Sequence, residues 1–352
     1  MLILGIETSC DETAAAVLEY KPLKKEVQFK IISNVISSQI SIHRQYGGII
    51  PEVAARAHIE NILPVIKKSL ENIDFKRIDL IAVTQGPGLI TSLLVGLETA
   101  KTLSYAFQKP LMGINHLQGH LAANFIEHEP KNIFPAISLI VSGGHTELGL
   151  IRKSGQYKKI GQTRDDAAGE CFDKIAKLLN IGYPGGPAVS KMAKKINNKS
   201  NNICFPRPML KTNDFDFSFS GLKTAVLYFV KENKNKLKKN KFIQNICAES
   251  QQAIIDVLIY KTIKASKKYK VKTVFLSGGV AANQELREQL KLNVCKLPNN
   301  VKFFVPSRNF CTDNAVMIAA AAALKFKNLT PIQKRKLKNN WQKIKVNPNL
   351  ET

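Results

Sequence analysis

The first part of the chain alternates between apolar and polar stretches in a way that predicts two strands joined by a turn. Leu2–Ile6 and Ala14–Leu18 are apolar, and the polar stretch Glu7–Thr13 separates them. About half a chain later the order returns, where Ser142–Thr146 is flanked by the apolar runs Ile137–Val141 and Leu148–Ile151. A recurring strand–turn–strand unit predicts an α/β protein built from two related lobes.

Helical periodicity fills much of the chain between these strands. Apolar residues recur at helical spacing in four long segments, which predict helices over Glu52–Leu70, Leu89–Phe107, Phe242–Tyr269 and Asp313–Phe326. Thr312 precedes the last of them and can cap its first turn. Another apolar strand, Thr273–Leu276, leads into Ser277-Gly278-Gly279. The length of 352 residues suits two lobes that share a cleft.

Composition argues against some classes of protein. No apolar run approaches the ~20 residues of a membrane-spanning helix. No basic leader precedes the first apolar stretch, which Glu7 interrupts, so we expect a soluble, cytoplasmic protein. The six cysteines are scattered without a CxxC pair, which argues against a zinc ribbon or a redox motif and favours reduced, inert thiols.

The chain is strongly basic, because 52 lysine and arginine residues minus 27 acidic residues leave a net charge of +25. Clustered positive charge attracts polyanions, so nucleic-acid binding is one interpretation. Compositional bias is the other, since many lysines lie in Lys/Asn-rich stretches such as Lys231–Lys241. The preferred binding arm has six basic residues and no acid: Lys334, Arg335, Lys336, Lys338, Lys343 and Lys345. We expect this polar end of the chain to be a frayed or appended helix.

His116 and His120 have the spacing of a pair of metal ligands. Residues four apart in a helix project from the same face, so both imidazoles can reach one ion. A pair of capping or packing histidines would show the same spacing. The zinc-protease motif HExxH is absent, because Leu117 stands where the glutamate would be. The pattern leaves a metal site open and argues against a peptidase.

Glycine-rich turns follow two of the predicted strands. In Ser142-Gly143-Gly144 and Ser277-Gly278-Gly279 the glycines lack Cβ atoms, so a nucleotide can contact the backbone there. Gly-Gly pairs are also common in plain hairpins, which is the competing interpretation. The motif GxxxxGK[ST] does not occur, which excludes the P-loop class.

Asp165, Asp166, Glu170 and Asp173 form an acidic cluster in this basic chain, and helical spacing puts the last three on one face. They are either a solvated helix start, which the helix macrodipole favours, or carboxylates that bind the hydroxyls or the ammonium group of a substrate. The sequence does not separate the two.

Ten short blocks, which continue to about residue 325, resemble the motifs of a known family in their order and content. It is the family of tRNA N6-adenosine threonylcarbamoyltransferases, called TsaD in bacteria, a glycoprotease-like family of the actin-like ATPase superfamily. The blocks are Gly5–Thr13, Ile42–Glu52 (with Arg56 and His58 beyond it), Gln85–Gly88, His116–Leu121, Val141–Thr146, Asp165–Lys174, Tyr183–Pro187, Phe217–Lys223, Ser277–Asn283 and Cys311–Asn314.

The resemblance implies an α/β fold of two actin-like (ribonuclease H-like) lobes with an interlobe cleft. The first lobe would cover residues 1–110. The second would cover residues 111–325, with the metal and adenylate sites and helical insertions at about 164–270, followed by a basic extension over residues 326–352. The implied reaction moves the threonylcarbamoyl group from threonylcarbamoyl-AMP to N6 of an adenosine in tRNA. That adenosine lies on the 3′ side of the anticodon in tRNAs that read codons beginning with adenine.

The resemblance also assigns residues. The metal ligands would be His116, His120 and Asp313, brought together in the interlobe cleft, with Fe²⁺ as the ion and Zn²⁺ as the alternative. Asp11 and Glu12 are the candidates for the group that takes the proton from the adenine amine. The adenylate would contact Ile140, Val141, Ser142, Gly143, Gly144, Asp173, Gly186, Gly279 and Asn283.

The family works with a paralogue that lacks the metal site, TsaB, and a small P-loop ATPase, TsaE, so both are expected partners beside tRNA, with no membrane. Two positions depart from the family pattern. Ile140 stands where archaeal and eukaryotic relatives have a metal-binding Tyr, which favours the bacterial type. Ser190 stands where some members have Asp, which puts a ribose contact there in doubt.

Other functions fit parts of this pattern. A carbamoyltransferase that acts on a small molecule is one, although the basic surface argues against it. A chaperone-like nucleotide switch on the same fold is another, and it would hydrolyse ATP slowly without acyl transfer. A secreted glycoprotease fits neither the missing signal peptide nor the missing HExxH motif.

Overall fold

The computed structural model describes residues 1–22, 27–128, 132–153, 156–196 and 203–351. The chain divides into two units. Unit 1 comprises Met1–His43, Ile49–Lys131 and Pro306–Thr352, and unit 2 comprises Arg44–Gly48 and Asn132–Val305. These limits differ from the predicted boundaries at residues 110 and 325, because a strand after residue 110 joins the first sheet and a late helix of the chain packs on that sheet.

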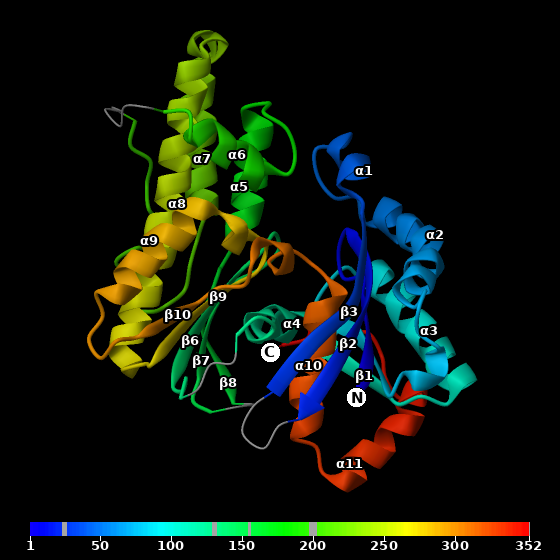
Figure 1. Cartoon of the computed structure of the whole chain (residues 1–352). Coiled ribbons are helices and arrows are strands. Elements are labelled where there is room, and N and C mark those ends of the chain that lie inside the picture. The colour runs from blue at the N-terminus through cyan, green and yellow to red at the C-terminus, as the bar shows by residue number, and fades with distance from the viewer. Residues whose placement is uncertain (23–26, 129–131, 154–155, 197–202, 352) are drawn as a thin grey trace. The chain divides into compact units, whose positions relative to one another are not determined.

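Unit 1 is built on a five-stranded sheet in the order β3-β2-β1-β4-β5 (Figure 1). The first three strands form an antiparallel meander, and β4 and β5 run parallel to β1. The predicted strand pair at the start of the chain is confirmed. The strands are β1 (Leu2–Glu7), β2 (Glu12–Pro22), β3 (Val27–Ser38), β4 (Leu80–Gly86) and β5 (Leu111–Asn115).

Unit 2 repeats this plan with a sheet in the order β10-β9-β6-β7-β8. Here β6, β7 and β8 form the antiparallel meander, and β9 and β10 run parallel to β6. The two sheets therefore have the same connectivity, and the predicted pair of related lobes is confirmed. The strands are β6 (Ala136–Val141), β7 (Thr146–Ile151), β8 (Tyr157–Gln162), β9 (Thr273–Ser277) and β10 (Lys302–Phe304).

Helices cover both sheets. All four predicted helices are present, with ends shifted by at most two residues. None of the helices in the described part of the chain has the length and apolar character that a membrane span requires. Unit 1 has α2 (Pro51–Ser69), α3 (Ile90–Phe107), α4 (His116–Ala122), α10 (Ala315–Lys327) and α11 (Pro331–Lys336); the short α1 (Ile40–Arg44) ends where unit 2 begins. Unit 2 has α5 (Ala168–Leu178), α6 (Gly185–Ala193), α7 (Ser220–Glu232), α8 (Asn240–Tyr269) and α9 (Gln284–Cys295).

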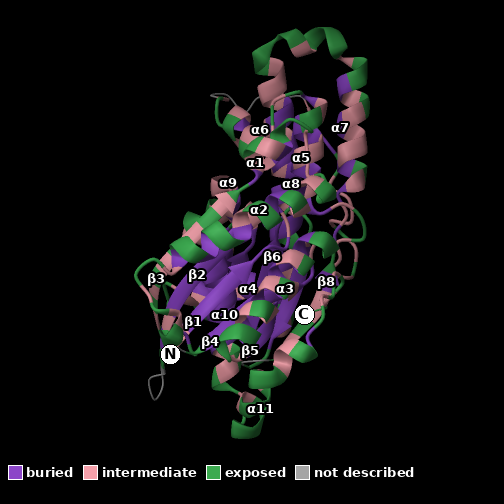
Figure 2. Ribbon diagram, turned by 90° about the vertical axis from the view of Figure 1, so that its right-hand side faces the viewer, coloured by how far each residue is buried: buried purple, intermediate pink, exposed green. Residues whose placement is uncertain are grey.

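The sheet of unit 1 buries an apolar face on each side, as the purple strands of Figure 2 show. Side chains alternate between the faces of a strand. Ala14, Ala16 and Leu18 of β2 therefore pack with α10, whereas Ala15 and Val17 pack with α2 and α3. The residues of α10 from 315 to 323 are all buried, as expected of a helix that is apolar all round.

The close approach of α10 to β1 depends on Gly5. A Cβ atom at this position would lie 2.2 Å from the carbonyl oxygen of Ala315 and 3.1 Å from the amide nitrogen of Ala319. Both are backbone atoms of α10 and cannot turn aside. Glycine is therefore required where the sheet meets the helix.

The predicted cap of α10 is wrong by two residues. Asn314, not Thr312, caps the helix, and its side chain accepts a hydrogen bond from the N–H of Met317 at 3.0 Å. Asn314 has extended backbone geometry, so the helix starts only at Ala315. Asp313 consequently lies in the loop before the helix, where its side chain can point elsewhere.

Of the two expectations for the C-terminal end, the appended helix is present as α11, whereas the frayed end is not observed over the described residues. α11 begins with a capping box between Thr330 and Gln333, and Ile344 is buried in the core of unit 1. The Asn340 side chain donates to the carbonyl oxygen of Leu111 at 2.9 Å. This segment covers the outer edge of β5, which would otherwise expose unpaired backbone groups.

Replacing Gly5 by Ala should destabilise unit 1, because the new Cβ atom would collide with the backbone of α10. Overpacking of this kind costs about 1–3 kcal/mol, so the midpoint of urea unfolding should fall. Gly221→Ala in α7 is the matched control, because its Cβ atom would first meet the Pro208 side chain at 3.3 Å. A midpoint unchanged by Gly5→Ala would contradict the described packing of α10 on β1.

Candidate active site

α4 carries the two predicted histidines and begins directly at the end of β5. Asn115, the last residue of β5, caps the helix, because its Oδ1 accepts from the N–H groups of Leu117 and Gln118 at 2.8 and 3.2 Å. His116 and His120 lie one turn apart on one face, and their ring centroids are 4.6 Å apart. Both side chains are buried.

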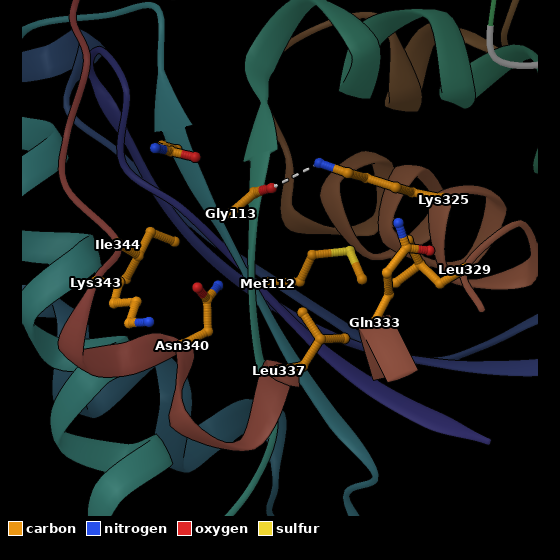
Figure 3. Close-up of a pocket in the computed structure, with 10 residues that line it drawn as sticks. Met112, Gly113, Lys325, Leu329, Gln333, Leu337, Asn340, Lys343 and Ile344 are labelled. Atoms are coloured by element: carbon orange, nitrogen blue, oxygen red, sulfur yellow. Dashed lines mark hydrogen bonds between the residues drawn. The ribbon is translucent and has the colours of Figure 1, made fainter. Parts of the chain in front are cut away.

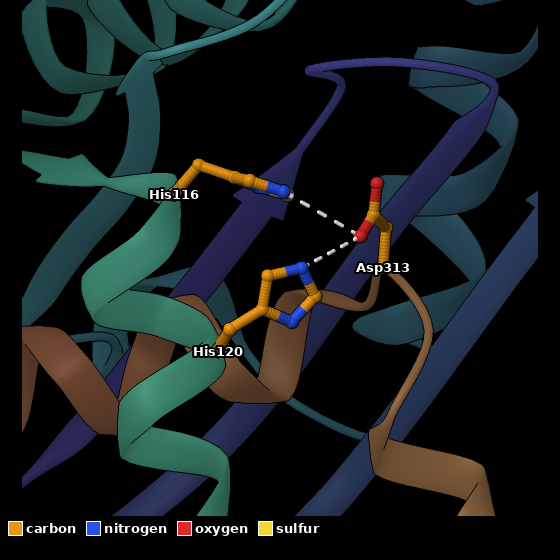
Figure 4. Close-up of side chains that lie close together, drawn as sticks. All are labelled: His116, His120 and Asp313. Atoms are coloured by element: carbon orange, nitrogen blue, oxygen red, sulfur yellow. Dashed lines mark ion pairs between the residues drawn. The ribbon is translucent and has the colours of Figure 1, made fainter. Parts of the chain in front are cut away.

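Asp313 joins these histidines from the loop before α10 (Figure 4). Its Oδ1 lies 3.5 Å from His116 Nε2 and 3.2 Å from His120 Nε2. Ligand atoms of the three residues all lie within 4.8 Å of one another. The fold therefore brings the predicted trio together. All three residues belong to unit 1, although the sequence boundaries placed them in the second lobe.

Glu7 supports His116 from the other side of the ring. It is fully buried at the end of β1, and its Oε2 lies 3.0 Å from His116 Nδ1. The same carboxylate accepts from the Thr84 hydroxyl at 2.7 Å and from the N–H of Ser9 at 2.5 Å. No role for Glu7 was predicted from the sequence. The sequence marks Glu7 only as an acidic residue at the end of an otherwise apolar strand.

The electrostatics of the trio fit a metal ion. Burial lowers the pKa of His116, but the carboxylates of Asp313 and Glu7 outweigh it and raise the pKa to about 9. His120 Nε2 contacts Asp313 Oδ1, but neither ring nitrogen of this buried residue makes a hydrogen bond to the described residues. A divalent ion would bind His120 and Asp313 together and would offset the two carboxylates as a proton does. Two imidazoles and one carboxylate also leave other positions of such an ion open.

The predicted proton acceptors lie between β1 and β2, with Asp11 in the connecting turn and Glu12 as the first residue of β2. His58 from α2 fixes this turn, because its Nε2 lies 3.0 Å from the carbonyl oxygen of Cys10. Burial raises the pKa of Glu12 well above its usual range, and the carboxylates of Asp11 and Asp313 raise it further. The carboxylate of Asp313 thus influences Glu12, which supports a place for Glu12 near the candidate metal centre.

In unit 2 the turn between β6 and β7 is closed tightly and supported by α5. The N–H of Ser142 donates to the carbonyl oxygen of His145 at 2.8 Å, and the N–H of Gly169 donates to that of Ser142 at 3.2 Å. A Cβ atom on Gly143 or Gly144 would meet nothing within 4 Å. The N–H groups of these two glycines have no partner among the described residues. The turn is therefore open to a ligand.

The second glycine turn follows β9, the parallel neighbour of β6. Gly278 has φ +90°, and a Cβ atom there would lie 2.4 Å from the carbonyl oxygen of Val141, so glycine is needed. Gly279 and Gly186 face open space. The N–H of Gly185, beside Gly186 in α6, donates to Asp173 of α5 at 2.6 Å. The two glycine turns lie at the carboxyl ends of the parallel strands β6 and β9, where ligands bind in open α/β sheets.

Asn283 is held by other side chains. Its Nδ2 donates to Ser190 Oγ and to Gln251 Oε1, both at 2.9 Å, and its Oδ1 accepts from the N–H of Leu286 at 3.1 Å. A contact from Asn283 to a ligand would use the second lone pair of Oδ1 or displace one of these partners. Gln251 was not predicted, because a single Gln inside the long helix α8 carries no signal in the sequence.

Two of the predicted substrate residues have no accessible side chain. Ile140 and Val141 are fully buried in β6, which pairs with β7 on one side and β9 on the other. If these two residues contact the substrate as predicted, they can do so only through their backbone atoms at the carboxyl end of β6.

Asp165 and Asp166, the first two residues of the acidic cluster, bind other parts of unit 2. Asp165 accepts four hydrogen bonds from Ser218–Ser220, and Asp166 pairs with Lys174 at 2.7 Å and with Lys223 at 3.1 Å. These contacts fasten the start of α7 to the chain that leads into α5. The contacts favour the structural interpretation of these two carboxylates.

Fold and site together define a class. It is an α/β protein of two related five-stranded units, with a His/His/Asp group that could hold a metal and a glycine turn open to a ligand. Full-length HypF in the phosphate- and nucleotide-bound form is similar in structure, with a TM-score of 0.55 and 16% identity, over 93% of this chain and 55% of that chain. T. kodakarensis HypF gives 0.60 and 15%, over 96% of this chain and 49% of that chain. At this identity the likeness shows the fold alone.

Sequence similarity is far closer to one family. Residues 30–320 match the family model described as TsaD, tRNA N6-adenosine threonylcarbamoyltransferase. A protein of that name from Syntrophomonas wolfei is 48% identical over 93% of both chains. Another from Halalkalibacterium halodurans is 45% identical over 94% of this chain and 92% of its own. The chain belongs to the tRNA N6-adenosine threonylcarbamoyltransferase family.

This membership confirms the predicted enzyme class and reaction, which is threonylcarbamoyl transfer to N6 of an adenosine in tRNA. It also decides against the two alternatives left open by the sequence, a small-molecule carbamoyltransferase and a chaperone-like switch.

Glu7→Gln should weaken metal binding by about 10–100-fold, because it removes the carboxylate that orients His116 and keeps the size of the side chain. The measurement is a titration of the purified chain with Co²⁺, followed by visible absorption. Glu98→Gln, an exposed substitution in α3, is the control. Equal Co²⁺ affinity in all three proteins would remove Glu7 from the metal site.

Proposed function

We propose that this chain takes the threonylcarbamoyl group from threonylcarbamoyl-AMP and transfers it, in the cytoplasm, to tRNAs that read codons beginning with adenine. The acceptor is N6 of the adenosine on the 3′ side of the anticodon. The observation that carries the proposal is the convergence of His116, His120 and Asp313 in a chain of this family.

His116, His120 and Asp313 would hold one divalent ion. Two imidazoles, one carboxylate and open positions favour Fe²⁺, with Zn²⁺ as the alternative. When bound, the ion supplies Lewis-acid polarisation and offsets the charge that develops as AMP leaves. Glu7 accepts from His116 Nδ1 and so keeps Nε2 toward Asp313.

The donor would bind to unit 2. The unpartnered N–H groups of Gly143 and Gly144 suit its phosphate and carboxyl oxygens, and Gly186 and Gly279 leave room beside them. Asp173 and Asn283 suit the ribose hydroxyls. The backbone of Ile140, Val141 and Ser142 completes the proposed contacts.

The acceptor amine is a poor nucleophile, because its lone pair is delocalised into the adenine ring. Positioning must therefore supply much of the rate. Asp11 and Glu12 are the proposed acceptors of the proton that leaves N6, and their place beside Asp313 supports this role.

Two substitutions should test the proposed metal centre of unit 1 and the proposed donor-binding turn of unit 2 separately. His120→Ala should slow single-turnover transfer from threonylcarbamoyl-AMP to tRNA by about 10²–10⁴-fold, because the metal contributes several kcal/mol to the transition state. Gly144→Val should instead raise the donor concentration needed for half-maximal rate, because its side chain would fill the open turn.

The control for both variants is His128→Ala, which changes an exposed histidine outside both sites. Full transfer by His120→Ala, or an unchanged donor requirement in Gly144→Val, would contradict the corresponding half of the proposal.

Transfer RNA would bind to the basic surface of the C-terminal segment. Five of its basic residues are exposed, and none of these five pairs with a carboxylate among the described residues: Arg335, Lys336, Lys338, Lys343 and Lys345. Removing the segment after Lys327 would also remove Ile344 from the core of unit 1. Side-chain substitutions therefore test the surface better than truncation does.

A pocket of about 340 Å³ opens on this surface at the outer edge of β5 (Figure 3). Lys325, Lys343 and the amide side chains of Gln85, Gln333 and Asn340 line it, together with apolar residues and no acid. Among the described residues, the one partner of Lys325 Nζ is the carbonyl oxygen of Gly113, at the long hydrogen-bond distance of 3.5 Å. A phosphate of the tRNA backbone would be a stronger partner for it.

Replacing Arg335, Lys336 and Lys338 by Gln should weaken tRNA binding and flatten its salt dependence. Each lost phosphate contact lowers the log–log slope by about 0.7–0.9, so the triple variant should lose roughly 2–3. Lys231, Lys234 and Lys238 in the Lys/Asn-rich stretch, changed together to Gln, form a control with the same change in charge. Equal slopes for the two triple variants would favour compositional bias as the source of the basic residues.

A TsaB-like paralogue and a TsaE-like ATPase are the proposed partners. The sequence has no P-loop motif, which supports a separate ATPase. Exposed apolar residues on α2 and α3, which pack against each other, support a protein interface. They are Ile59 and Leu63, each 63% exposed, and Ile90 and Leu94, 51% and 40% exposed.

Changing Ile59 and Leu63 together to Glu should weaken binding of the purified paralogue by at least about tenfold, because charges would enter an apolar interface. Isothermal titration calorimetry measures the affinity. Ile332→Glu on α11, where the side chain is 67% exposed, is the control. If the double variant binds as tightly as the unmodified chain, the paralogue docks elsewhere.

A further inference from the structure

The last described residues, 345–351, are bound along the ends of β4 and β5, and we call them the C-terminal strap. Gln85 at the end of β4 holds the strap twice. Its Nε2 donates to the carbonyl oxygen of Lys345 at 2.8 Å, and its own carbonyl oxygen accepts from the N–H of Asn347 at 2.9 Å. The N–H of Gly88 donates to the carbonyl oxygen of Pro348 at 3.3 Å. The strap is therefore part of the fold of unit 1.

Gly86 lets the strap lie this close. Its φ is +151°, and a Cβ atom there would lie 1.8 Å from the carbonyl oxygen of Asn347 and 3.3 Å from the side chain of Leu350. Any other residue would push the strap away. The motif Gln85-Gly86-Pro87-Gly88, which the sequence left without a role, thus forms the seat of the strap.

The strap also holds the residue that starts the metal-bearing helix. Asn115 Nδ2 donates to the carbonyl oxygens of Leu350 and Glu351, both at 3.1 Å. The amide group is planar, so these two bonds direct its Oδ1 toward the first turn of α4, where it accepts from Leu117 and Gln118. The orientation of the helix start at the next residue, His116, depends on this cap.

A second set of contacts leads to the same histidine. A Cβ atom on Gly88 would lie 2.6 Å from the carbonyl oxygen of Ser9, and this oxygen accepts from the N–H of Leu89 at 2.9 Å. Ser9 Oγ in turn lies 3.1 Å from His116 Nδ1. The seat of the strap therefore packs against the turn that touches the imidazole.

We propose that the C-terminal strap positions the metal ligand His116 through the side chain of Asn115, so that docking of the strap and binding of the metal stabilise each other. Asn115 is thus a positioning residue, because it contacts neither the substrate nor the metal. The proposal rests on the metal site proposed above. Since coupling between two binding equilibria is reciprocal, metal should tighten the strap as much as the strap tightens metal.

The first test measures Co²⁺ affinity in full-length Asn115→Ser and in a chain that lacks residues 350–352. Ser keeps an oxygen that can cap α4 but is too short to reach the strap, and the deletion removes the two carbonyl acceptors. Each variant should bind Co²⁺ about 10–100-fold more weakly than the unmodified chain. The combined variant should be no weaker than the weaker single one, because both changes remove the same contact.

The second test measures hydrogen exchange of the strap amides with and without Co²⁺. Exchange should slow on addition of Co²⁺ in the unmodified chain and in Asn349→Ala, which changes an exposed strap residue. His120→Ala, which cannot form the metal site, should show no such slowing. If the strap had only a structural role, the strap variants would be less stable, but Co²⁺ affinity and the effect of Co²⁺ on hydrogen exchange would not change.

The outcomes separate the strap from the metal site. Two results would overturn the coupling and leave the metal site intact. One is an unchanged Co²⁺ affinity in both strap variants. The other is a rate of hydrogen exchange in the strap that Co²⁺ does not change, in a chain that binds Co²⁺. Absence of Co²⁺ binding by the unmodified chain would overturn the metal site and this proposal with it.

Discussion

The buried contact between Glu7 and His116 is the constraint on which unit 1 depends. A carboxylate out of reach of water is costly unless its oxygens are paired. Glu7 meets this need with the Thr84 hydroxyl, the N–H of Ser9 and the imidazole of His116. Because Asp313 lies on the other side of the same ring, the imidazole stands between two carboxylates. Strand β1, helix α4 and the loop before α10 are fixed relative to one another by this arrangement.

The two units share one strand topology but carry different side chains at the equivalent turn. Each opens with a strand, a turn and an antiparallel strand, followed by strands parallel to the first. In unit 1 the turn and the first residue of β2 carry the acidic side chains of Asp11 and Glu12. In unit 2 the equivalent turn has glycines at Gly143 and Gly144, so it exposes backbone N–H groups rather than acidic side chains. In the proposed function, the charged group of unit 1 has the role of the metal centre, and the glycine turn of unit 2 has the role of the donor-binding turn.

Much of this could be predicted from the sequence, because it depends on short-range patterns. Apolar runs predicted the paired strands, helical spacing predicted the four long helices, and the spacing of His116 and His120 predicted two of the three candidate metal ligands. What failed depends on contacts between distant parts of the chain. The cap of α10 falls on Asn314, the partner of Asn283 is Gln251, and the basic C-terminal segment is bound at Asn115. No local pattern marks such hydrogen bonds.

X-ray absorption of the iron-loaded chain tests the central claim most directly. The account predicts nitrogen and oxygen ligands at about 2.0–2.2 Å, with the multiple-scattering signal of two imidazoles. His116→Ala, if it retains any iron, should show the signal of a single imidazole, and Asp313→Asn should keep both. Sulfur ligands, or an imidazole signal that is unchanged in His116→Ala, would contradict the account.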